Sequence, residues 1–178
     1  MKILTVNNKK EKKFLREKTA KFDFSGFSKV EIQELIKKMR EIMEISNGIG
    51  LSANQLGLDL RLFVAHLPEI PRESALSPRQ SAPGKFYAIF NPEITKFSKE
   101  KIVMEEGCLS VPGFYGLVER PEKITLVGYD KNAKKIKIKA WGLLARVFQH
   151  EIDHLNGILF IDRTKKVYKL PTKEQQTL

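Results

Sequence analysis

Residues 149–157 read Gln-His-Glu-Ile-Asp-His-Leu-Asn-Gly, and this stretch decides both the fold and the chemistry. Two histidines, His150 and His154, stand four residues apart, and Glu151 directly follows the first. On an α-helix four residues advance by roughly 400°, so both rings leave one face about 6 Å apart along the axis. Such a pair can hold one divalent metal ion, and the glutamate can reach a metal-bound water without being a ligand.

The surrounding residues indicate that this stretch is helical. Apolar side chains recur at steps of three and four residues, at Leu143, Leu144, Val147, Phe148, Ile152 and Leu155. We expect the helix to begin near Gly142 and to end at Asn156-Gly157, a common C-terminal stop. The alternative is two surface histidines on an amphipathic helix, but two of only three histidines stand at ligand spacing. The third, His66, is expected to be a loop or packing residue.

The rest of the chain predicts an α+β fold, with antiparallel or mixed sheets around the metal-binding helix and an N-terminal helix. Ser28 and Glu31 form a capping-box pattern before an apolar stripe, which predicts a helix that ends near Ser46. Strands are expected at 60–65, 86–90, 94–97, 102–105, 117–120, 124–129 and 136–140. The strands at 94–97 and 102–105 are expected to pair as a hairpin. Proline-rich residues 67–85 indicate a long irregular loop.

Length and charge set further bounds. We expect residues 1–178 to form a single catalytic domain, with a loose polar tail from about residue 164. The net charge of +11 is more typical of solvated lysine-rich faces, although it is also compatible with a weak ribosome contact. The sequence lacks the aromatic-basic interleaving of common RNA-binding modules, so no specific nucleic acid is expected. It also lacks an eighteen-residue apolar run and a signal-peptide core, so we expect no membrane association and a cytoplasmic location.

A catalytic site built on two histidines needs at least one more protein ligand and an open position for water. A third histidine in the pattern His-x-x-Gly-x-x-His is absent, because Phe160 stands at that position. A downstream glutamate is available only as Glu174, in the polar terminus. Cys108, the only cysteine, remains as the third ligand. By itself a lone cysteine excludes an internal disulfide and leaves burial, metal binding or nucleophilic chemistry open.

A Cys/His/His site with one water is tetrahedral and positively charged, which lowers the pKa of the bound water towards roughly 7. Glu151 can take the proton and pass it to a leaving amine, while hydroxide attacks a carbonyl. The oxyanion needs donors, for which Gln55 and the backbone amide of Leu109 are the candidates. The chemistry is therefore hydrolysis of an amide or similar acyl bond. Residues 48–55, which contain Gln55, are by themselves equally compatible with a tight helix-to-strand turn.

Three stretches together resemble the motifs of peptide deformylases, in the same order. They are Gly-Ile-Gly-Leu-Ser-Ala-Asn-Gln at 48–55, Glu-Gly-Cys-Leu-Ser at 106–110 and Gln-His-Glu-Ile-Asp-His at 149–154. The resemblance covers about residues 30–163. It implies removal of the N-formyl group from the formylmethionine of nascent polypeptides, with release of formate. It also implies one divalent metal ion per chain, usually Fe²⁺, replaceable by Zn²⁺, Ni²⁺ or Co²⁺.

The resemblance also implies residue roles. The implied metal ligands are Cys108, His150 and His154. Metal-bound hydroxide would attack the formyl carbonyl, with Glu151 as general acid and base and with Gln55 and the Leu109 amide at the oxyanion. The substrate-binding residues would be Ile49, Gly50, Gly107 and Val147. Residues supporting the ligands from behind would be Glu106, Arg120 and Asp153, for which a plain ion pair is the alternative.

The chain departs from the family pattern in a few places. Ser52 stands where the first motif often has alanine, and we expect this small-for-small change to be harmless. The N-terminal segment is lysine-rich and lacks a Pro-Asp-Pro stretch, and little C-terminal helix is expected. Two other classes stay open: a zinc metalloendopeptidase of the His-Glu-x-x-His type, and a basic RNA- or ribosome-binding module with a structural metal.

Overall fold

The computed structural model describes residues 1–67 and 84–169 of the chain. Most of the expected loop at 67–85 and the end of the expected tail therefore lie outside the described residues. The helices are α1 (Lys9–Leu15), η1 (Phe24–Gly26), α2 (Lys29–Ile45), η2 (Ala53–Leu56), α3 (Gly142–Leu155) and η3 (Phe160–Asp162). The strands are β1 (Gly50–Ser52), β2 (Leu62–His66), β3 (Phe86–Phe97), β4 (Lys101–Cys108), β5 (Val111–Pro121), β6 (Lys123–Tyr129), β7 (Lys135–Trp141) and β8 (Val167–Lys169).

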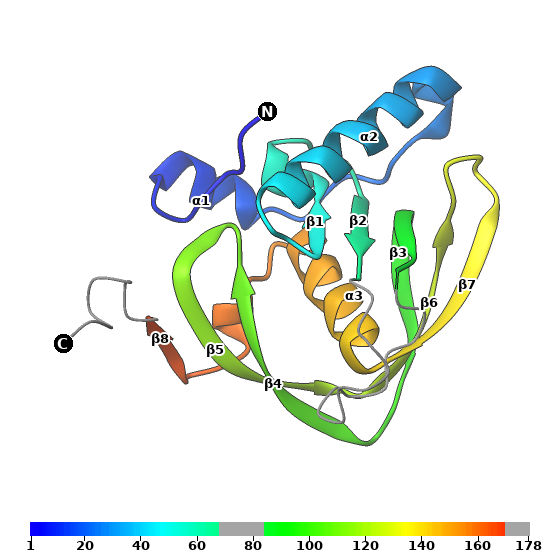
Figure 1. Ribbon diagram of the computed structural model, residues 1–178. Coiled ribbons are helices and arrows are strands. Elements are labelled where there is room, and N and C mark those ends of the chain that lie inside the picture. The colour runs from blue at the N-terminus through cyan, green and yellow to red at the C-terminus, as the bar shows by residue number, and fades with distance from the viewer. Residues whose placement is uncertain (68–83, 170–178) are drawn as a thin grey trace.

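Helix α3 occupies the centre of the molecule, between the two sheets (Figure 1). Its apolar residues join a core cluster with side chains of the larger sheet, among them Phe63, Tyr87 and Ile89. Phe148 of the helix lies against the rings of Phe63 and Tyr87, with centroids 5.4 and 5.2 Å apart. The helix begins at Gly142, as predicted, and its C-cap is Asn156. Burial on nearly every side fixes the helix that carries His150 and His154.

Helix α2 begins and ends as its sequence predicts. The Ser28 hydroxyl accepts a hydrogen bond from the Glu31 amide at 3.2 Å, and Glu31 accepts one from the Ser28 amide at 2.8 Å. The capping box is therefore confirmed. At the other end Ser46 is the C-cap and Asn47 adopts the left-handed conformation, with φ of 54°. This reversal leads the chain directly into β1, which packs against α3.

The strands form two antiparallel sheets, so the α+β prediction is confirmed in its antiparallel form. One sheet has the order β1-β2-β3-β6-β7 and the other has the order β4-β5-β8. The predicted hairpin between 94–97 and 102–105 is wrong, because β3 pairs with β6 whereas β4 pairs with β5. Residues 98–100 form a corner where the chain passes from one sheet to the other, and the Ser98 amide donates to the Lys123 carbonyl at 2.8 Å.

Strands β3 and β8 also differ from the prediction. Strand β3 continues through Asn91 and Pro92, where the prediction ended it, because the strand bends there with a register shift and a φ of 47° at Asn91. Strand β8 lies within the segment expected to be a loose tail, and pairs with β5 at the edge of the smaller sheet. None of the helices in the described ranges has the length and apolarity needed to cross a membrane.

The N-terminal segment closes over the C-terminal end of α3. The Thr19 amide donates to the Leu155 carbonyl at 3.0 Å, and the Thr19 hydroxyl donates to the same carbonyl at 3.1 Å. Gly157, with φ of 73°, lets the Arg16 backbone approach so closely that a Cβ would lie 2.2 Å from the Arg16 carbonyl oxygen. Both guanidinium nitrogens of Arg16 donate to Asp162. These contacts hold the C-terminal end of α3 in place.

Candidate metal centre

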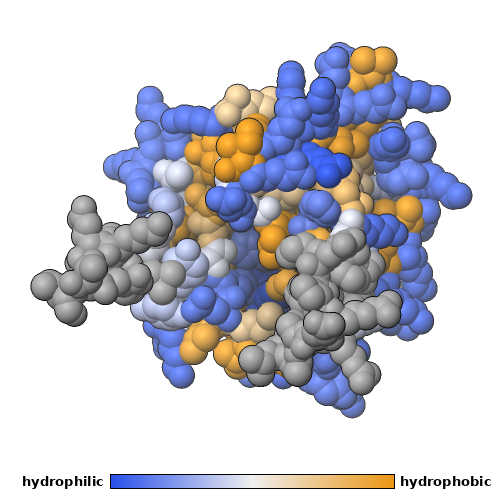
Figure 2. Space-filling model, in the orientation of Figure 1, coloured by the Kyte–Doolittle hydropathy of each residue, from blue (hydrophilic) through white to orange (hydrophobic). Residues whose placement is uncertain are grey.

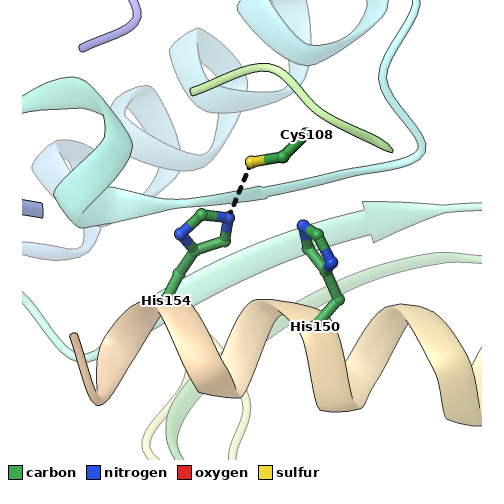
Figure 3. A group of neighbouring side chains, drawn as sticks. All are labelled: Cys108, His150 and His154. Atoms are coloured by element: carbon green, nitrogen blue, oxygen red, sulfur yellow. Dashed lines mark hydrogen bonds between the residues drawn. The ribbon is translucent and has the colours of Figure 1, made fainter. Parts of the chain in front are cut away.

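Cys108, His150 and His154 converge from two elements that are distant in sequence. The histidines rise from the same face of α3, and Cys108 faces them from the end of β4 (Figure 3). Their ligand atoms all lie within 4.8 Å of one another, and Cys108 Sγ is 3.1 Å from His154 Nε2. One sulfur and two imidazole nitrogens at this spacing suit a divalent iron or zinc ion. His66 stays apart from this group, 3.6 Å from Glu44.

The environment of Cys108 favours the thiolate, the form that binds metal. Burial alone would raise the pKa of the thiol, but the charges and hydrogen bonds of His154 and His150 outweigh it, so the pKa lies well below its ordinary value. A register shift after Gly107 turns the strand so that the Ser110 amide donates to Cys108 Sγ at 3.4 Å. Both effects stabilise negative charge on the sulfur.

The two histidines are held differently. His150 Nδ1 lies 2.9 Å from Glu106 Oε2, which directs the opposite ring nitrogen towards the other ligands. The His154 Nδ1 is buried and has no hydrogen-bond partner within the described residues. Burial alone would lower the pKa of His150, but Cys108 and Glu106 outweigh it and raise the pKa well above its ordinary value.

A buried ionic network supports the ligands from behind. Glu106 accepts from Arg120 at 2.6 and 2.9 Å and from Arg146 at 2.8 Å, while Arg120 also donates to Asp153 at 2.6 Å. Burial would raise the pKa of Glu106, but Arg120 and His150 hold it far below its ordinary value. The sequence had pointed to Glu106, Arg120 and Asp153 but missed Arg146, for which an arginine inside an apolar helical stripe was the available signal.

Glu151 is 3% exposed and its two carboxylate oxygens have different surroundings. Oε2 accepts a hydrogen bond from the Ser52 hydroxyl at 2.7 Å. Oε1 lies beside Gly50, where an added Cβ would be only 2.4 Å away. Burial raises the pKa of Glu151 above its ordinary value, although the neighbouring histidines and the Ser52 hydrogen bond act in the opposite direction. A carboxyl group with a raised pKa suits proton transfer near neutral pH.

Gln55 places its side-chain amide group next to Cys108 Sγ. Its Oε1 accepts from the Ser52 amide at 2.9 Å, which fixes the orientation of the side chain. Its Nε2 therefore points towards the site and donates to Ser110 Oγ at 3.1 Å, with Cys108 Sγ at 3.7 Å. An amide donor held in this way can stabilise negative charge that develops beside the ligands.

These groups line a cavity of about 470 Å³ between the two sheets. The face that carries it is hollowed near its centre, with hydrophobic surface above and below the hollow (Figure 2). The lining includes the sequence-predicted site residues Ile49, Gly50, Gln55, Gly107, Cys108, Leu109, Val147, His150 and Glu151. His154 is not part of the lining, but its Nε2 lies 3.1 Å from Cys108 Sγ. Apolar neighbours complete the lining, including Leu143, Val111, Pro112 and Phe114.

Comparison with known proteins agrees with this arrangement. Residues 1–169 match the family model described as polypeptide deformylase. A peptide deformylase of Roseiflexus castenholzii is 38% identical over 176 residues, covering 98% of this chain and 94% of its own. One from Thermodesulfovibrio yellowstonii is 47% identical over 133 residues, covering 75% of this chain and 74% of its own.

Solved structures with the same fold include two described as peptide deformylases. A probable peptide deformylase from Synechococcus phage S-SSM7 has a TM-score of 0.76 at 40% identity, covering 92% of this chain and 99% of its own. The Met-Ala-Ser-bound enzyme from Acinetobacter baumannii has a TM-score of 0.81 at 29% identity, covering 92% of this chain and 98% of its own.

Proposed function

The chain belongs to the peptide deformylase family, and on that premise we propose how its own residues carry out the reaction. The enzyme removes the formyl group from N-terminal formylmethionine of nascent polypeptides and releases formate. Water adds to the formyl carbon and the C–N bond breaks, so one proton must move from the water to the departing amine. The observation that carries the residue roles is the convergence of Cys108, His150 and His154 beside the buried Glu151.

We propose that Cys108, His150 and His154 hold one divalent ion, Fe²⁺ in the cell, with Zn²⁺, Ni²⁺ or Co²⁺ as replacements. The lowered pKa of Cys108 supports this role, because the thiolate is the ligand form. When bound, the ion supplies Lewis-acid activation of water and of the formyl carbonyl. Thiolate and imidazole suit each of these metals, so the assignment of iron rests on the family resemblance alone.

Glu151 is the general base and then the general acid in this proposal. Its Oε1 is the oxygen next to the cavity, whereas Oε2 is occupied by Ser52. Oε1 therefore accepts the proton of the attacking water and returns it to the amine nitrogen as the C–N bond breaks. Gln55 Nε2 and the Leu109 amide donate to the oxyanion that forms in between.

The substrate is proposed to lie along the edge of β1. This strand pairs only with β2 in the larger sheet, and Ile49 and Gly50 line the cavity beside it. A formyl-peptide can therefore lie in extended form between the backbones of Ile49, Gly50 and Gly107. Ile49 and Val147 would contact the methionine side chain. The exposed 36% of Ile49 supports a role at the entrance.

We further propose that residues 1–178 form a single catalytic domain that works in the cytoplasm. The net charge of +11 supports a weak, salt-sensitive contact with ribosomes. We propose no specific nucleic acid as a partner. Co-sedimentation with ribosomes at low and at high salt tests that contact.

The decisive experiment measures formate release from a formyl-Met peptide by protein purified anaerobically and loaded with Fe²⁺, with metal content determined in parallel. Cys108→Ala should lose both the metal and the activity. A site formed without the sulfur, as in a metalloendopeptidase, would keep its metal in this variant.

Glu151→Gln separates the proton-transfer role from the metal site. This variant should retain the metal and lose activity by a factor of at least about 10². Glu41→Gln, on the exposed face of α2, is the matched control and should behave as the parent. Full activity of Glu151→Gln would contradict the proposed role.

A further inference from the structure

We propose that Ser52 is a positioning residue for the acid–base carboxylate, which it holds so that Oε1 of Glu151 serves the reacting atoms. This inference rests on the proposed function and deepens it. The sequence suggested that a serine at this position, often alanine in the family motif, would be harmless. The contacts of its hydroxyl group assign it a part in the reaction instead.

Ser52 stands behind the site, out of reach of the substrate. Its residue is 0% exposed, and it is absent from the residues that line the cavity. Its Oγ lies 2.7 Å from Glu151 Oε2 and 2.9 Å from the Glu151 carbonyl oxygen. The hydroxyl carries one proton, and the nearer, charged oxygen is the stronger acceptor when Glu151 is ionised. Ser52 thus contacts the base without contacting the bound peptide.

This contact distinguishes the two oxygens of one carboxylate. Oε2 accepts the hydrogen bond of the Ser52 hydroxyl, and Ser52 is not among the residues that line the cavity. Oε1 lies against Gly50, on the side of the cavity. Rotation of the carboxylate would leave a buried oxygen without its donor, at a cost comparable to a lost hydrogen bond to a charged group. The hydrogen bond therefore keeps Oε1 at the position where the proton is exchanged.

The backbone of Ser52 has a separate task. Its amide donates to Gln55 Oε1 at 2.9 Å and thereby orients the Gln55 amide group. Ser52 itself is held in strand β1 opposite Phe63 of β2, at the edge of the larger sheet. One residue thus fixes two side chains of the site by different atoms. Ser52→Ala removes the hydroxyl alone and leaves the bond to Gln55 intact.

A purely structural explanation is that the Ser52 hydroxyl anchors α3 through the Glu151 carbonyl. Thr19 provides the matched control for that explanation. It is 7% exposed, and its hydroxyl donates to the carbonyl of Leu155 in the same helix at 3.1 Å. Thr19→Val removes a buried hydroxyl that anchors α3 but that has no contact with the carboxylate. The two variants therefore separate anchoring of the helix from positioning of the base.

The test compares kcat, KM, metal content and thermal stability of the parent, Ser52→Ala and Thr19→Val on a formyl-Met peptide. We expect kcat of Ser52→Ala to fall about tenfold, as expected for one hydrogen bond to a charged group, with KM and metal content unchanged. Thr19→Val should lose thermal stability and keep kcat. In the Glu151→Gln background the Ser52 change should have no further effect on kcat, because its partner is already altered.

A kcat for Ser52→Ala within twofold of the parent overturns the proposal, whatever the change in stability. An equal fall in kcat when Ser52→Ala is added to Glu151→Gln also overturns the proposal, because the hydroxyl would then act independently of the carboxylate. Failure of the parent protein itself to release formate would instead refute the proposed function, so the two failures are distinguishable.

Discussion

Gly50 shows how closely the backbone of β1 approaches the acid–base group. A Cβ added at this position would lie 2.4 Å from Glu151 Oε1 and 3.0 Å from Val147 Cγ1. We expect Gly50→Ala to displace the carboxylate and to lower kcat by about 10², the size of effect that a misplacement near 1 Å produces. Steady-state kinetics on a formyl-Met peptide measure this fall in kcat. Gly26→Ala, where a Cβ would meet nothing within 4 Å, should leave kcat unchanged.

Glu106 is the centre of the buried ionic network and also touches a metal-site histidine. Glu106→Gln removes the carboxylate that compensates Arg146 and one of the two carboxylates that compensate Arg120, which should cost about 3–5 kcal/mol of unfolding free energy. Loss of the His150 contact should weaken metal binding by about 10- to 100-fold. Urea unfolding and competition with a metal chelator measure the two effects.

Glu119→Gln is the control for the Glu106 variant. Its carboxylate is 57% exposed and pairs with Lys101 at the surface, where such pairs contribute at most about 1 kcal/mol. If both variants lost the same stability, the network would not be an important part of the fold.

The residue roles differ in how far the sequence could predict them. The sequence could predict Cys108, His150 and His154, because cysteine and histidine are rare in this chain and the two histidines stand at a helical spacing. The sequence could not predict the Ser52–Glu151 hydrogen bond, because this bond joins residues 99 positions apart and depends on how β1 packs against α3. Arg146 was missed for the same reason, since its acceptors lie on β4 and β5.

Among the elements, the junction of α3 with the N-terminal segment depends on Gly157. Gly157→Ala combines an unfavourable φ of 73° with a Cβ that would lie 2.2 Å from the Arg16 carbonyl oxygen. Gly113→Ala has an equally unfavourable φ of 79°, but its Cβ would meet nothing within 4 Å. The first variant should be less stable than the second by at least about 2 kcal/mol, the cost of overpacking. Denaturant unfolding of both proteins checks the difference, and equal losses would show that the approach of Arg16 costs nothing.

The ion pair between Arg16 and Asp162 adds a pH dependence at the same junction. Burial would raise the pKa of Asp162, but donation from Arg16 and from the Leu159 amide outweighs it, so the pKa lies below its ordinary 3.8. A lowered folded-state pKa contributes stability that is present above pH 3.8 and disappears as the pH falls through the folded-state value. Asp162→Asn should therefore be less stable than the parent at pH 7, and the gap should narrow below pH 3.8.

Thermal unfolding between pH 3 and 7 measures that gap. Arg16→Ala should reproduce most of the effect, because it removes the largest interaction that lowers this pKa. A gap that stays constant with pH would rule out the ion pair as its source.

Helices were easier to predict than strand partners. The ends of α2 and α3 follow from local signals, namely the Ser28–Glu31 capping box and the Asn-Gly pair after each helix. The partners of β3 and β4 do not follow from local signals, because a three-residue connection suits a hairpin as well as the corner found at 98–100. Strand β8 also depends on a distant partner. Its sequence, Val-Tyr-Lys, forms a strand because the edge of β5 is available for pairing.

For the molecule as a whole, the proposed ion would link β4, which carries Cys108, to α3, which carries His150 and His154. Binding of an ion to the native state alone stabilises it by about 2.7 kcal/mol at a free concentration one hundred times Kd. Removal of the ion with a chelator should abolish formate release and lower the Tm by several degrees, roughly 2–8 °C. Re-addition of Fe²⁺ under anaerobic conditions should restore both. Cys108→Ser should show no Tm response to the chelator, and an equal response would place the ion elsewhere.

The distance in sequence between the sulfur and the imidazoles has a consequence for biosynthesis. Cys108 leaves the ribosome 42 residues before His150, an interval of about 2–8 s at ordinary rates of translation. Until the histidines arrive, the sulfur lacks the neighbours that lower its pKa, so it remains a protonated and poorly oxidisable thiol. The folding event that lowers the pKa of the sulfur is also the one that brings the two imidazoles beside it, so the reactive thiolate and the proposed ligand set form together.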